Sequence, residues 1–409
     1  GSGRKIRHTI PLLQNRVAEY NIKSHLRPQS EAEVLTWIQE GWLKPVEKTD
    51  IGLVPLLAVD QESKGKVRPV MDYRELNQYI QSHTGNSDVC SERLQVWRRM
   101  GKKMALLDLR KAYLQIHVAP ELWQFQTIEH KGRRYQLTRL GFGLSSAPKI
   151  MSAILGKVLS LDTRILEATS HYIDDIAVDT SRISTDEVVG HLAVFGLKTK
   201  PTEDLRGAKP LGLRVSTDST GVLRWRRSKE IDDGPCDKST TRRELFAICG
   251  KLVGNYPVAG WLRVATSFVK RHSEGSSWTD SIGDRCAGMM GEMLTKVKAS
   301  DPVQVNWVVS KSRSGRVWCD ASNLALGVVL EIDAIRVEDA SWIRKKDDCA
   351  HINVAELDAV LKGINLCRQW DLAEIELMTD SATVAGWLRA TLTKESKVRI
   401  HGISEILIK

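Results

Sequence analysis

The sequence predicts a mixed α/β (α+β) protein with a compact C-terminal unit, and two kinds of pattern support this prediction. First, residues 104–109 and 171–179 are short apolar runs that carry aspartates, as strands do when they end at a polar site. Second, residues 317–390 follow the order of three strands, a helix, a strand and a helix, which is typical of a separate α/β unit. We expect a linker at residues 310–315, where Ser, Lys, Arg and Gly predominate.

The elements before this unit follow from apolar spacing and from turn residues. Residues 31–43 place apolar side chains at helical spacing, and Ser30 precedes them as a favourable N-cap. Residues 52–70 have the pattern of two strands around a turn at 62–65. Two further helices are expected at about 147–159 and 242–254.

The composition favours a globular protein that meets a polyanion. The chain has 409 residues, of which 42% are apolar and 27% are charged, and this balance excludes a disordered chain. Sixty Lys and Arg against fifty Asp and Glu give a net charge of +10, which suits nucleic acid. No apolar stretch approaches the ~18 residues that span a bilayer. Seven scattered cysteines without a CxxC pair favour a reducing compartment.

The pair Asp174–Asp175, within the apolar hairpin at 171–179, is the sharpest chemical signal in the first 300 residues. Adjacent buried carboxylates need partners, and a divalent metal ion is the natural one where no Lys or Arg stands beside them. The alternative is an exposed turn, in which Asp pairs are common. A second strand that ends on Asp108 favours the metal site, because three carboxylates can hold two Mg²⁺ ions about 4 Å apart.

Five motifs occur in the order found in one enzyme family. They are KVRPVMDYRELN (66–77), LLDLRKAYLQI (106–116), FGLSSAP (142–148), YIDD (172–175) and LGLRV (211–215). In these motifs the chain resembles reverse transcriptases of retroviruses and LTR retrotransposons, from about Glu31 to Lys270. The segment GKLVGNYPVAGWLRVA favours a retrotransposon lineage, gypsy-like or BEL/Pao-like.

The resemblance implies a right-hand polymerase fold followed by a ribonuclease H-like α/β domain. Fingers and palm are expected at residues 1–200, and the primer grip, thumb and connection at 201–310. The ribonuclease H-like domain is expected at 311–409. We expect this last domain to be C-terminally incomplete.

The resemblance also assigns substrate-binding residues, and each assignment has a chemical reason. Lys66 and Arg68 would point to one face of a strand and bind the triphosphate, the alternative being a solvated basic hairpin. Tyr113 would exclude the ribose 2′-OH, or else be a core tyrosine. Gly143 would let the backbone approach the nucleotide. Phe142 stands where retroviral relatives often carry Gln.

Two positions near these motifs leave open questions. Gly141 replaces a proline that is common in the family. Lys198 and Lys200 both lie where the family has a lysine near the triphosphate, and the sequence does not choose between them. Lone lysines are more often surface charges.

The C-terminal unit carries its own acids, Asp320, Glu356 and Asp380, at two strand ends and near a helix start. Thirty-six residues separate the first from the second and 24 separate the second from the third. This order resembles ribonuclease H, which implies two Mg²⁺ ions and cleavage of RNA in a hybrid. The alternatives are a helix-dipole carboxylate for Glu356 and an N-cap for Asp380. The fourth carboxylate of that family has no counterpart before Lys409, so we expect either that the chain was cut before this residue or that the protein was trimmed and its nuclease is weak or dead.

The sequence therefore predicts an RNA- and DNA-directed DNA polymerase that uses Mg²⁺, with Mn²⁺ as an alternative. Asp108, Asp174 and Asp175 are the expected metal ligands of the polymerase site. The expected partners are an RNA template, a DNA primer, an RNA/DNA hybrid and dNTPs, without a membrane, and a homodimer or other Pol-derived subunits are further options. The expected location is the cytoplasm, in a retroelement particle, or the nucleus. Two rivals are a non-catalytic nucleic-acid-binding or structural subunit and a polymerase that uses NTPs.

Overall fold

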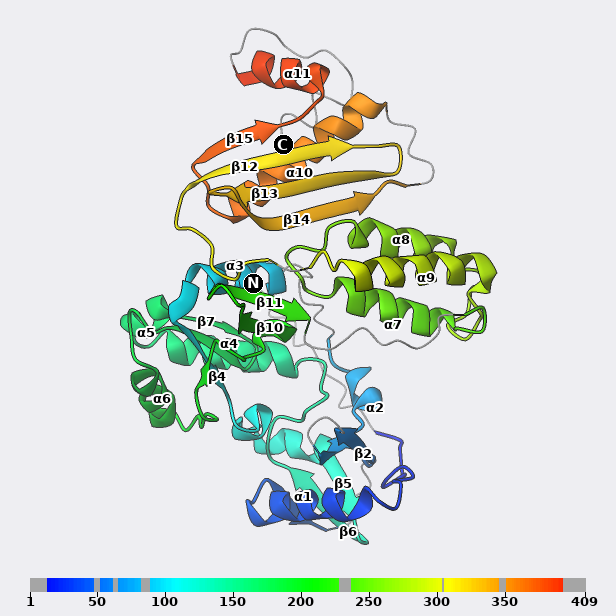
Figure 1. The fold of residues 1–409 in the computed structure, drawn as a ribbon. Helices are drawn as coiled ribbons and strands as arrows, with labels where there is room; N and C mark the ends of the chain where they lie inside the picture. Colours follow the sequence, from blue (N-terminus) through cyan, green and yellow to red (C-terminus); the bar gives the residue numbers. More distant parts are fainter. Residues whose placement is uncertain are drawn as a thin grey trace, which may run out of the picture. The chain divides into compact units, whose positions relative to one another are not determined.

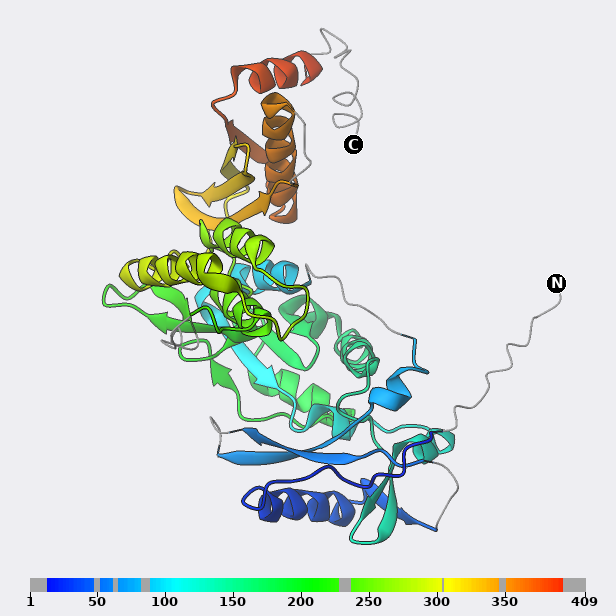
Figure 2. The ribbon, with the colours of Figure 1, turned by 90° about the vertical axis from the view of Figure 1, so that its right-hand side faces the viewer.

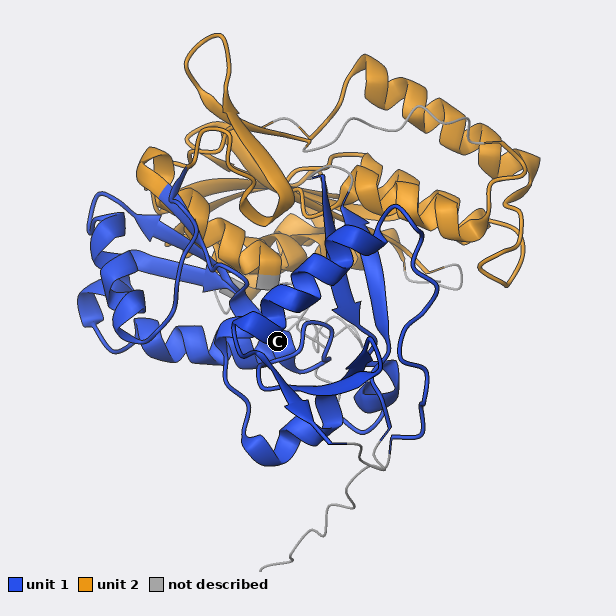
Figure 3. Cartoon of the chain, turned by 90° about the horizontal axis from the view of Figure 1, so that it is seen from below, with its two compact units in different colours: residues 1–87, 105–203 blue, residues 88–104, 204–409 orange. Residues whose placement is uncertain are grey.

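The computed structural model describes residues 13–47, 52–61, 65–81, 89–227, 237–303, 305–345 and 351–392. The chain forms two compact units, coloured separately in Figure 3. Unit 1 comprises residues 1–87 and 105–203, and unit 2 comprises residues 88–104 and 204–409. The short segment 88–104 thus leaves unit 1 in the middle of its sequence and belongs to unit 2. The domain boundaries predicted at residues 200 and 310 stay predictions.

The first part of unit 1 is built from two small antiparallel sheets (Figure 1). Strands β2 (Leu56–Gln61) and β3 (Lys66–Met71) form a hairpin, and the second sheet has the order β1 (Leu43–Val46), β6 (Arg133–Leu137), β5 (Thr127–His130). Helix α1 (Arg27–Gln39) packs against β3. The short helix α2 (Arg74–Asn77) follows β3. The helix predicted at 31–43 lies four residues earlier, because a proline in the first turn starts it at Arg27 and Gly41, with φ +69°, follows its end at Gln39. The predicted N-cap Ser30 is wrong: this residue is buried inside the helix, and the N-cap is Leu26.

A four-stranded sheet forms the second part of unit 1. Its order is β7 (Thr169–Tyr172), β8 (Asp175–Asp179), β4 (Met104–Asp108), β9 (Glu203–Asp204). Helices α4 (Ala147–Leu159), α5 (Thr163–Ala168) and α6 (Thr185–Val194) accompany it. The short 3₁₀ helices η3 (Ala112–Gln115) and η4 (Pro120–Gln126) follow β4. Leu107, Ile176 and Val178 are fully buried in one core with Met151 and Leu155 of α4, which explains why the strands are so apolar.

Unit 2 begins with a helix, a hairpin and three further helices. These are α3 (Val89–Arg99), β10 (Leu213–Thr217) paired with β11 (Leu223–Arg227), α7 (Arg242–Val253), α8 (Leu262–His272) and α9 (Gly283–Ala299). The N-cap of α7 is Thr241, whose hydroxyl accepts from the Glu244 amide while Glu244 bonds back to the Thr241 amide. The helix ends before Gly254, as predicted, and this glycine has φ +45°.

The C-terminal part of unit 2 is a four-stranded sheet covered on one face by a helix (Figure 2). Its strands lie in the order β14 (Ile335–Ile343), β13 (Ala325–Ile332), β12 (Ser314–Ala321), β15 (Glu374–Met378). Helices α10 (Ile352–Gln369) and α11 (Ala382–Leu392) complete the predicted order of elements. A Cβ on Gly363 of α10 would lie 2.5 Å from the Cys319 Sγ, so glycine permits the helix to approach β12.

The predicted linker at 310–315 is shorter than expected. Strand β12 already begins at Ser314, and the Arg313 carbonyl accepts hydrogen bonds from the amides of Ala373 and Glu374. These bonds extend the parallel pairing of β12 with β15 towards the linker. Within the described residues, no helix is both long and apolar enough to cross a membrane.

Candidate active sites

The first site is built on the turn between β7 and β8. Tyr172 and Asp175 are paired across the hairpin, and Ile173 at its tip has φ +57°, a left-handed conformation that is strained for a β-branched residue. Asp108 ends β4, the neighbour of β8 in the sheet. Two adjacent strands therefore deliver Asp108, Asp174 and Asp175 to one end of the sheet, as the sequence predicted.

These carboxylates lie in an electrostatically unfavourable place. Burial raises the pKa of Asp174, and the charge of Asp108 raises it further. Burial also raises the pKa of Asp175 to about 6, with further contributions from Asp174 and Asp108. A cation near them would relieve this repulsion.

Lys200 supplies part of that positive charge. Its ammonium group pairs with the Asp108 carboxylate, and its backbone amide donates to the Asp108 carbonyl at 2.8 Å. Lys198 lines a different pocket, together with Gln115, His117 and Arg139. The structure thus resolves the question left open by the sequence, because Lys200 is the lysine beside the aspartates.

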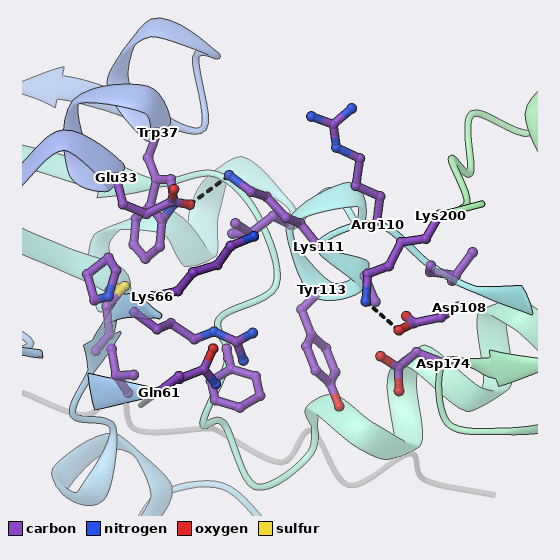
Figure 4. Close-up of a pocket in the computed structure, with 18 of the residues that line it drawn as sticks. Glu33, Trp37, Gln61, Lys66, Asp108, Arg110, Lys111, Tyr113, Asp174 and Lys200 are labelled. Atoms are coloured by element: carbon purple, nitrogen blue, oxygen red, sulfur yellow. Dashed lines mark hydrogen bonds and ion pairs between the residues drawn. The ribbon is translucent and has the colours of Figure 1, made fainter. Parts of the chain in front are cut away.

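A cavity of about 780 Å³ opens in front of Asp108 and Asp174 (Figure 4). Its wall includes the predicted residues Lys66, Arg68, Tyr113 and Phe142, together with Lys200. Asp175 and Gly143 do not line it. The cavity therefore places two carboxylates opposite cations from β3, as Figure 4 shows for Lys66.

An aromatic pair forms one side of this cavity. The rings of Tyr113 and Phe142 lie 5.6 Å apart between centroids, and the Arg68 guanidinium lies 5.6 Å from the Phe142 ring centroid. Phe142 is 48% exposed, so its ring is available to a ligand. Burial, followed by the charge of Asp174, raises the pKa of Tyr113 to about 12 and keeps the phenol protonated.

Gly143 and Gly141, which lie in this region, are each required to be glycine for a different structural reason. Gly143 has φ +112°, which a side chain rarely adopts, and its carbonyl accepts a hydrogen bond from Asn77. Gly141 is set by packing, because a Cβ there would lie 2.0 Å from the Tyr73 hydroxyl oxygen and 2.6 Å from Oε1 of Gln126. A proline at 141 would need this buried Tyr73–Gln126 hydrogen bond to be rebuilt.

Sequence reasoning missed one charged pair in the same cavity. Lys111 has φ +51°, and its ammonium group lies 2.6 Å from the Glu33 carboxylate and 5.1 Å from the Trp42 ring centroid. Figure 4 shows this pair at the far side of the cavity from Asp174. Lys111 lies within the LLDLRKAYLQI motif, but nothing in the sequence links it to a glutamate of α1.

The second site lies at the edge of the C-terminal sheet. Because β12 and β15 are parallel neighbours, their carboxyl ends meet at the same edge and bring Asp320 close to Asp380. Glu356 reaches them from the first part of α10, and ligand oxygens of all three lie within 4.8 Å of one another. The three predicted acids therefore converge.

Of the three acids, Glu356 has the surroundings that most favour a bound cation. It is only 6% exposed; its Oε1 accepts from the Ala321 amide at 3.2 Å, whereas its Oε2 is buried without a hydrogen-bond partner. Burial raises its pKa, and the charges of Asp320 and Asp380 raise it further. Three carboxylates and an unpaired buried oxygen fit a hard divalent cation, which prefers oxygen ligands.

The two sites differ in how closely their acids gather. Among the residues that the structure describes, Asp320, Glu356 and Asp380 are the one group of three acids close enough to share a metal ion, with ligand oxygens within 4.8 Å of one another. A cleft of about 690 Å³ beside them is lined by Asp320, Asp380 and the indole of Trp318, which is 43% exposed. At the first site Lys200 already occupies one carboxylate, so a cation there would compete with it.

Three family models match the chain. The model described as reverse transcriptase (RNA-dependent DNA polymerase) matches residues 48–215, and the one described as reverse transcriptase-like matches residues 312–406. Between them, residues 241–299 match a domain of unknown function (DUF7047). The first match contains Asp108, Asp174 and Asp175, and the second contains Asp320, Glu356 and Asp380.

Two solved structures share the fold. One is the foamy viral protease–reverse transcriptase dRH in complex with double-stranded DNA, with a TM-score of 0.71 and 16% identity, covering 98% of this chain and 69% of that chain. The other is the foamy viral protease–reverse transcriptase in complex with double-stranded DNA, with the same TM-score and identity, covering 98% and 82%. The predicted fold class is thereby confirmed.

Proposed function

Because the chain belongs to the reverse transcriptase–ribonuclease H region of retroelement Pol proteins, we propose that it extends a DNA primer with dNTPs on an RNA or DNA template. The observation that carries this proposal is the cavity that joins Asp108 and Asp174 to Lys66, Arg68 and Tyr113. Carboxylates on one wall and cations on another suit a substrate that carries a polyphosphate.

Each residue of the cavity has a task in this reaction. Lys66 and Arg68 stand two apart on β3 and bind the negative triphosphate. Phe142 holds the Arg68 guanidinium by cation–π contact and offers its exposed face to the nucleotide. Tyr113 limits the space at the sugar and so selects dNTPs against NTPs.

Asp108, Asp174 and Asp175 would hold Mg²⁺, in the expected number of two ions, with Mn²⁺ as an alternative. When bound, the ions lower the pKa of the primer 3′-OH and offset charge on the leaving pyrophosphate. The pocket walls align the 3′-OH with the α-phosphate, and Lys200 offers positive charge beside the pyrophosphate as the bond breaks.

For the second site we propose cleavage of RNA in an RNA/DNA hybrid. Asp320, Glu356 and Asp380 would hold the same kind of ion, which activates water for attack on a phosphodiester. The observation behind this is the buried Glu356 Oε2 that lacks a partner.

The proposed partners are an RNA template, a DNA primer and their hybrid. The net charge of +10 supports this proposal, as do the two foamy viral neighbours, which were solved with double-stranded DNA. We further propose a retrotransposon lineage and a location in a cytoplasmic retroelement particle, which the resemblance suggests.

The test is extension of a DNA primer on an RNA template with dNTPs and Mg²⁺. Asp174→Asn should abolish extension, whereas Asp186→Asn, an exposed acid on α6, should leave it unchanged. Silence of the unmodified chain, with hybrid binding intact, would contradict the polymerase and favour a binding subunit.

A second measurement tests sugar selection. Tyr113→Ala should admit ribonucleotides, with discrimination falling roughly 10- to 200-fold because the bulk that excludes a hydroxyl is lost. Steady-state incorporation of dCTP and CTP opposite the same template base gives this ratio. An unchanged ratio would assign Tyr113 to the core alone.

A further inference from the structure

Arg98 of α3 is buried inside unit 2 with only 1% of its surface exposed. Its guanidinium carbon lies 4.6 Å from the ring centroid of Trp225 and 5.3 Å from that of Trp370. The guanidinium also donates to three backbone carbonyls: Nη1 to Val337 at 2.6 Å, Nη2 to Asn306 at 3.0 Å and Nε to Trp307 at 3.2 Å. One side chain therefore contacts four separate segments, because Asn306 and Trp307 are consecutive residues.

Such burial is unfavourable for a charge unless its hydrogen bonds are satisfied. Burial lowers the pKa of Arg98 to about 9, and the nearby Glu338 opposes this shift. An apolar side chain of similar length could fill the same space between the two indoles. It could not satisfy three carbonyls that converge on one point, so the arginine specifies how these segments meet.

A second layer of hydrogen bonds surrounds Glu338, which is next to the Val337 carbonyl on β14. Glu338 accepts from Ser91 Oγ at 3.1 Å, Gln95 Nε2 at 2.9 Å and Trp370 Nε1 at 2.6 Å. Ser91 and Gln95 are on α3, like Arg98, so this helix contacts β14 through three side chains.

Asp339 ties the same strand to the segment before α8. It accepts from the amides of Ala259 at 2.9 Å and Gly260 at 2.6 Å, and from Arg263 Nε at 3.2 Å. Val337, Glu338 and Asp339 are all buried, although alternate residues of a strand at a sheet edge would normally face solvent. The outer edge of the C-terminal sheet is thus a polar interface with the rest of unit 2.

The network connects the hairpin that resembles a primer grip to the acids of the C-terminal sheet. Trp225 is on β11, and its partner strand β10 contains residues 213–215 of the primer-grip-like LGLRV motif. Val337 belongs to the sheet that carries Asp320, and Trp370 immediately follows α10, which carries Glu356. Arg98 contacts both groups directly.

We propose that Arg98 is a positioning residue that holds the β10–β11 hairpin at one fixed distance from the carboxylates Asp320, Glu356 and Asp380. The proposal rests on the proposed function, in which the carboxylates cut the RNA, and on the primer grip expected within 201–310, which would let the hairpin hold the primer strand. A fixed distance means that RNA in the hybrid is cut at one main position relative to the primer end. The C-terminal sheet then acts as part of unit 2, and its linker at 310–313 does not work as a hinge.

The first experiment measures the distance without any activity. Spin labels at Arg214→Cys on β10 and Asn323→Cys beside Asp320, both exposed, report it in a chain whose Cys90, Cys236 and Cys349 are serine. The chain with Arg98 should give one narrow distance peak. In Arg98→Met the population outside this peak should rise roughly 2- to 30-fold, as for other residues that couple two sites. Arg93→Lys on the same helix is the matched control and should leave the peak unchanged.

The second experiment maps RNA cuts in a hybrid whose primer end is fixed. Arg98→Met should spread the cuts over neighbouring positions, and Arg98→Lys should rescue the main position only in part, because lysine lacks the planar fork. If Arg98→Met does not fold, Trp370→Phe is the second variant, because it keeps an aromatic ring at this position and removes the indole N–H that donates to Glu338. The RNA cuts should then spread over fewer neighbouring positions than in Arg98→Met.

The outcomes separate the two proposals. A broad distance in the unmodified chain, or a narrow one in folded Arg98→Met, would overturn the positioning role. If the unmodified chain cuts no RNA while its distance is narrow and depends on Arg98, the positioning role stands and the proposed nuclease is wrong.

Discussion

The two acidic centres of this chain use the same residue type in opposite surroundings. We call the site of Asp108, Asp174 and Asp175 the palm centre, and the site of Asp320, Glu356 and Asp380 the nuclease-like centre. In the palm centre, Asp108 is paired with Lys200, and the cavity in front of it is also lined by Lys66 and Arg68. The cleft beside the nuclease-like centre, within the described residues, is lined by acids, apolar groups and Trp318, without a lysine or arginine. The comparison teaches that, under the proposed function, the site for a triphosphate carries its own cations, whereas the site for a phosphodiester would take its positive charge from a bound ion.

The largest expected effect tests whether the two centres act separately. Asp108→Asn should lower primer extension by roughly 10³-fold or more and leave RNA cleavage unchanged, because each centre has its own ligands. Glu356→Gln should do the reverse. Extension and hybrid cleavage by the same preparations give both numbers. Loss of both activities in either variant would show that the centres are not independent.

Sequence reasoning found the acids of both centres because each stands at a strand end or helix start within a recognisable motif. It placed Asp320 and Asp380 at strand ends and expected a shared site only from the resemblance to ribonuclease H, whereas the parallel pairing that brings them together came from the structure. It could not choose Lys200 over Lys198, since that choice depends on how β4 and the 199–200 segment pair. It also missed Arg98, which meets the Val337 carbonyl across 239 residues. Contacts between distant segments arise only from the tertiary fold.

An intermediate effect concerns the stability of the metal-free chain. The pKa of Asp175 is raised from 3.8 to about 6, so the folded state binds a proton more tightly than the unfolded state. The protonated Asp175 carboxyl therefore adds to the free energy of unfolding, in full below about pH 4. This contribution is lost as the pH rises through about 6 and the carboxyl loses its proton in the folded state.

Asp175→Asn should remove this dependence. At pH 7.5 in EDTA the variant should be more stable by about 1–2 kcal/mol, a figure discounted for partial exposure, and the difference should vanish near pH 4. Urea unfolding at several pH values measures it. Asp320→Asn is a useful comparison, because Asp320 is exposed and a smaller gain is expected there. A variant that is less stable at pH 7.5 would contradict the repulsion inferred at the palm.

The smallest expected effect tests how the Lys200 side chain changes the affinity of the palm centre for a metal ion. In the metal-free chain Lys200 competes with an ion for Asp108, and both partners are partly exposed, with 46% and 33% of their side-chain surface accessible. Lys200→Met should therefore raise the affinity of the palm centre for Mn²⁺ by about 2- to 5-fold, the value of a surface ion pair. Electron paramagnetic resonance titration in a Glu356→Gln background isolates this site. Lys198→Met should have no effect, because its side chain lines the other pocket. A weaker affinity for Mn²⁺ in Lys200→Met would mean that the lysine orders the Asp108 carboxylate for the ion and does not compete with it. The lysine would then be a part of the metal site at the palm centre, a part for which the nuclease-like centre has no counterpart in its cleft.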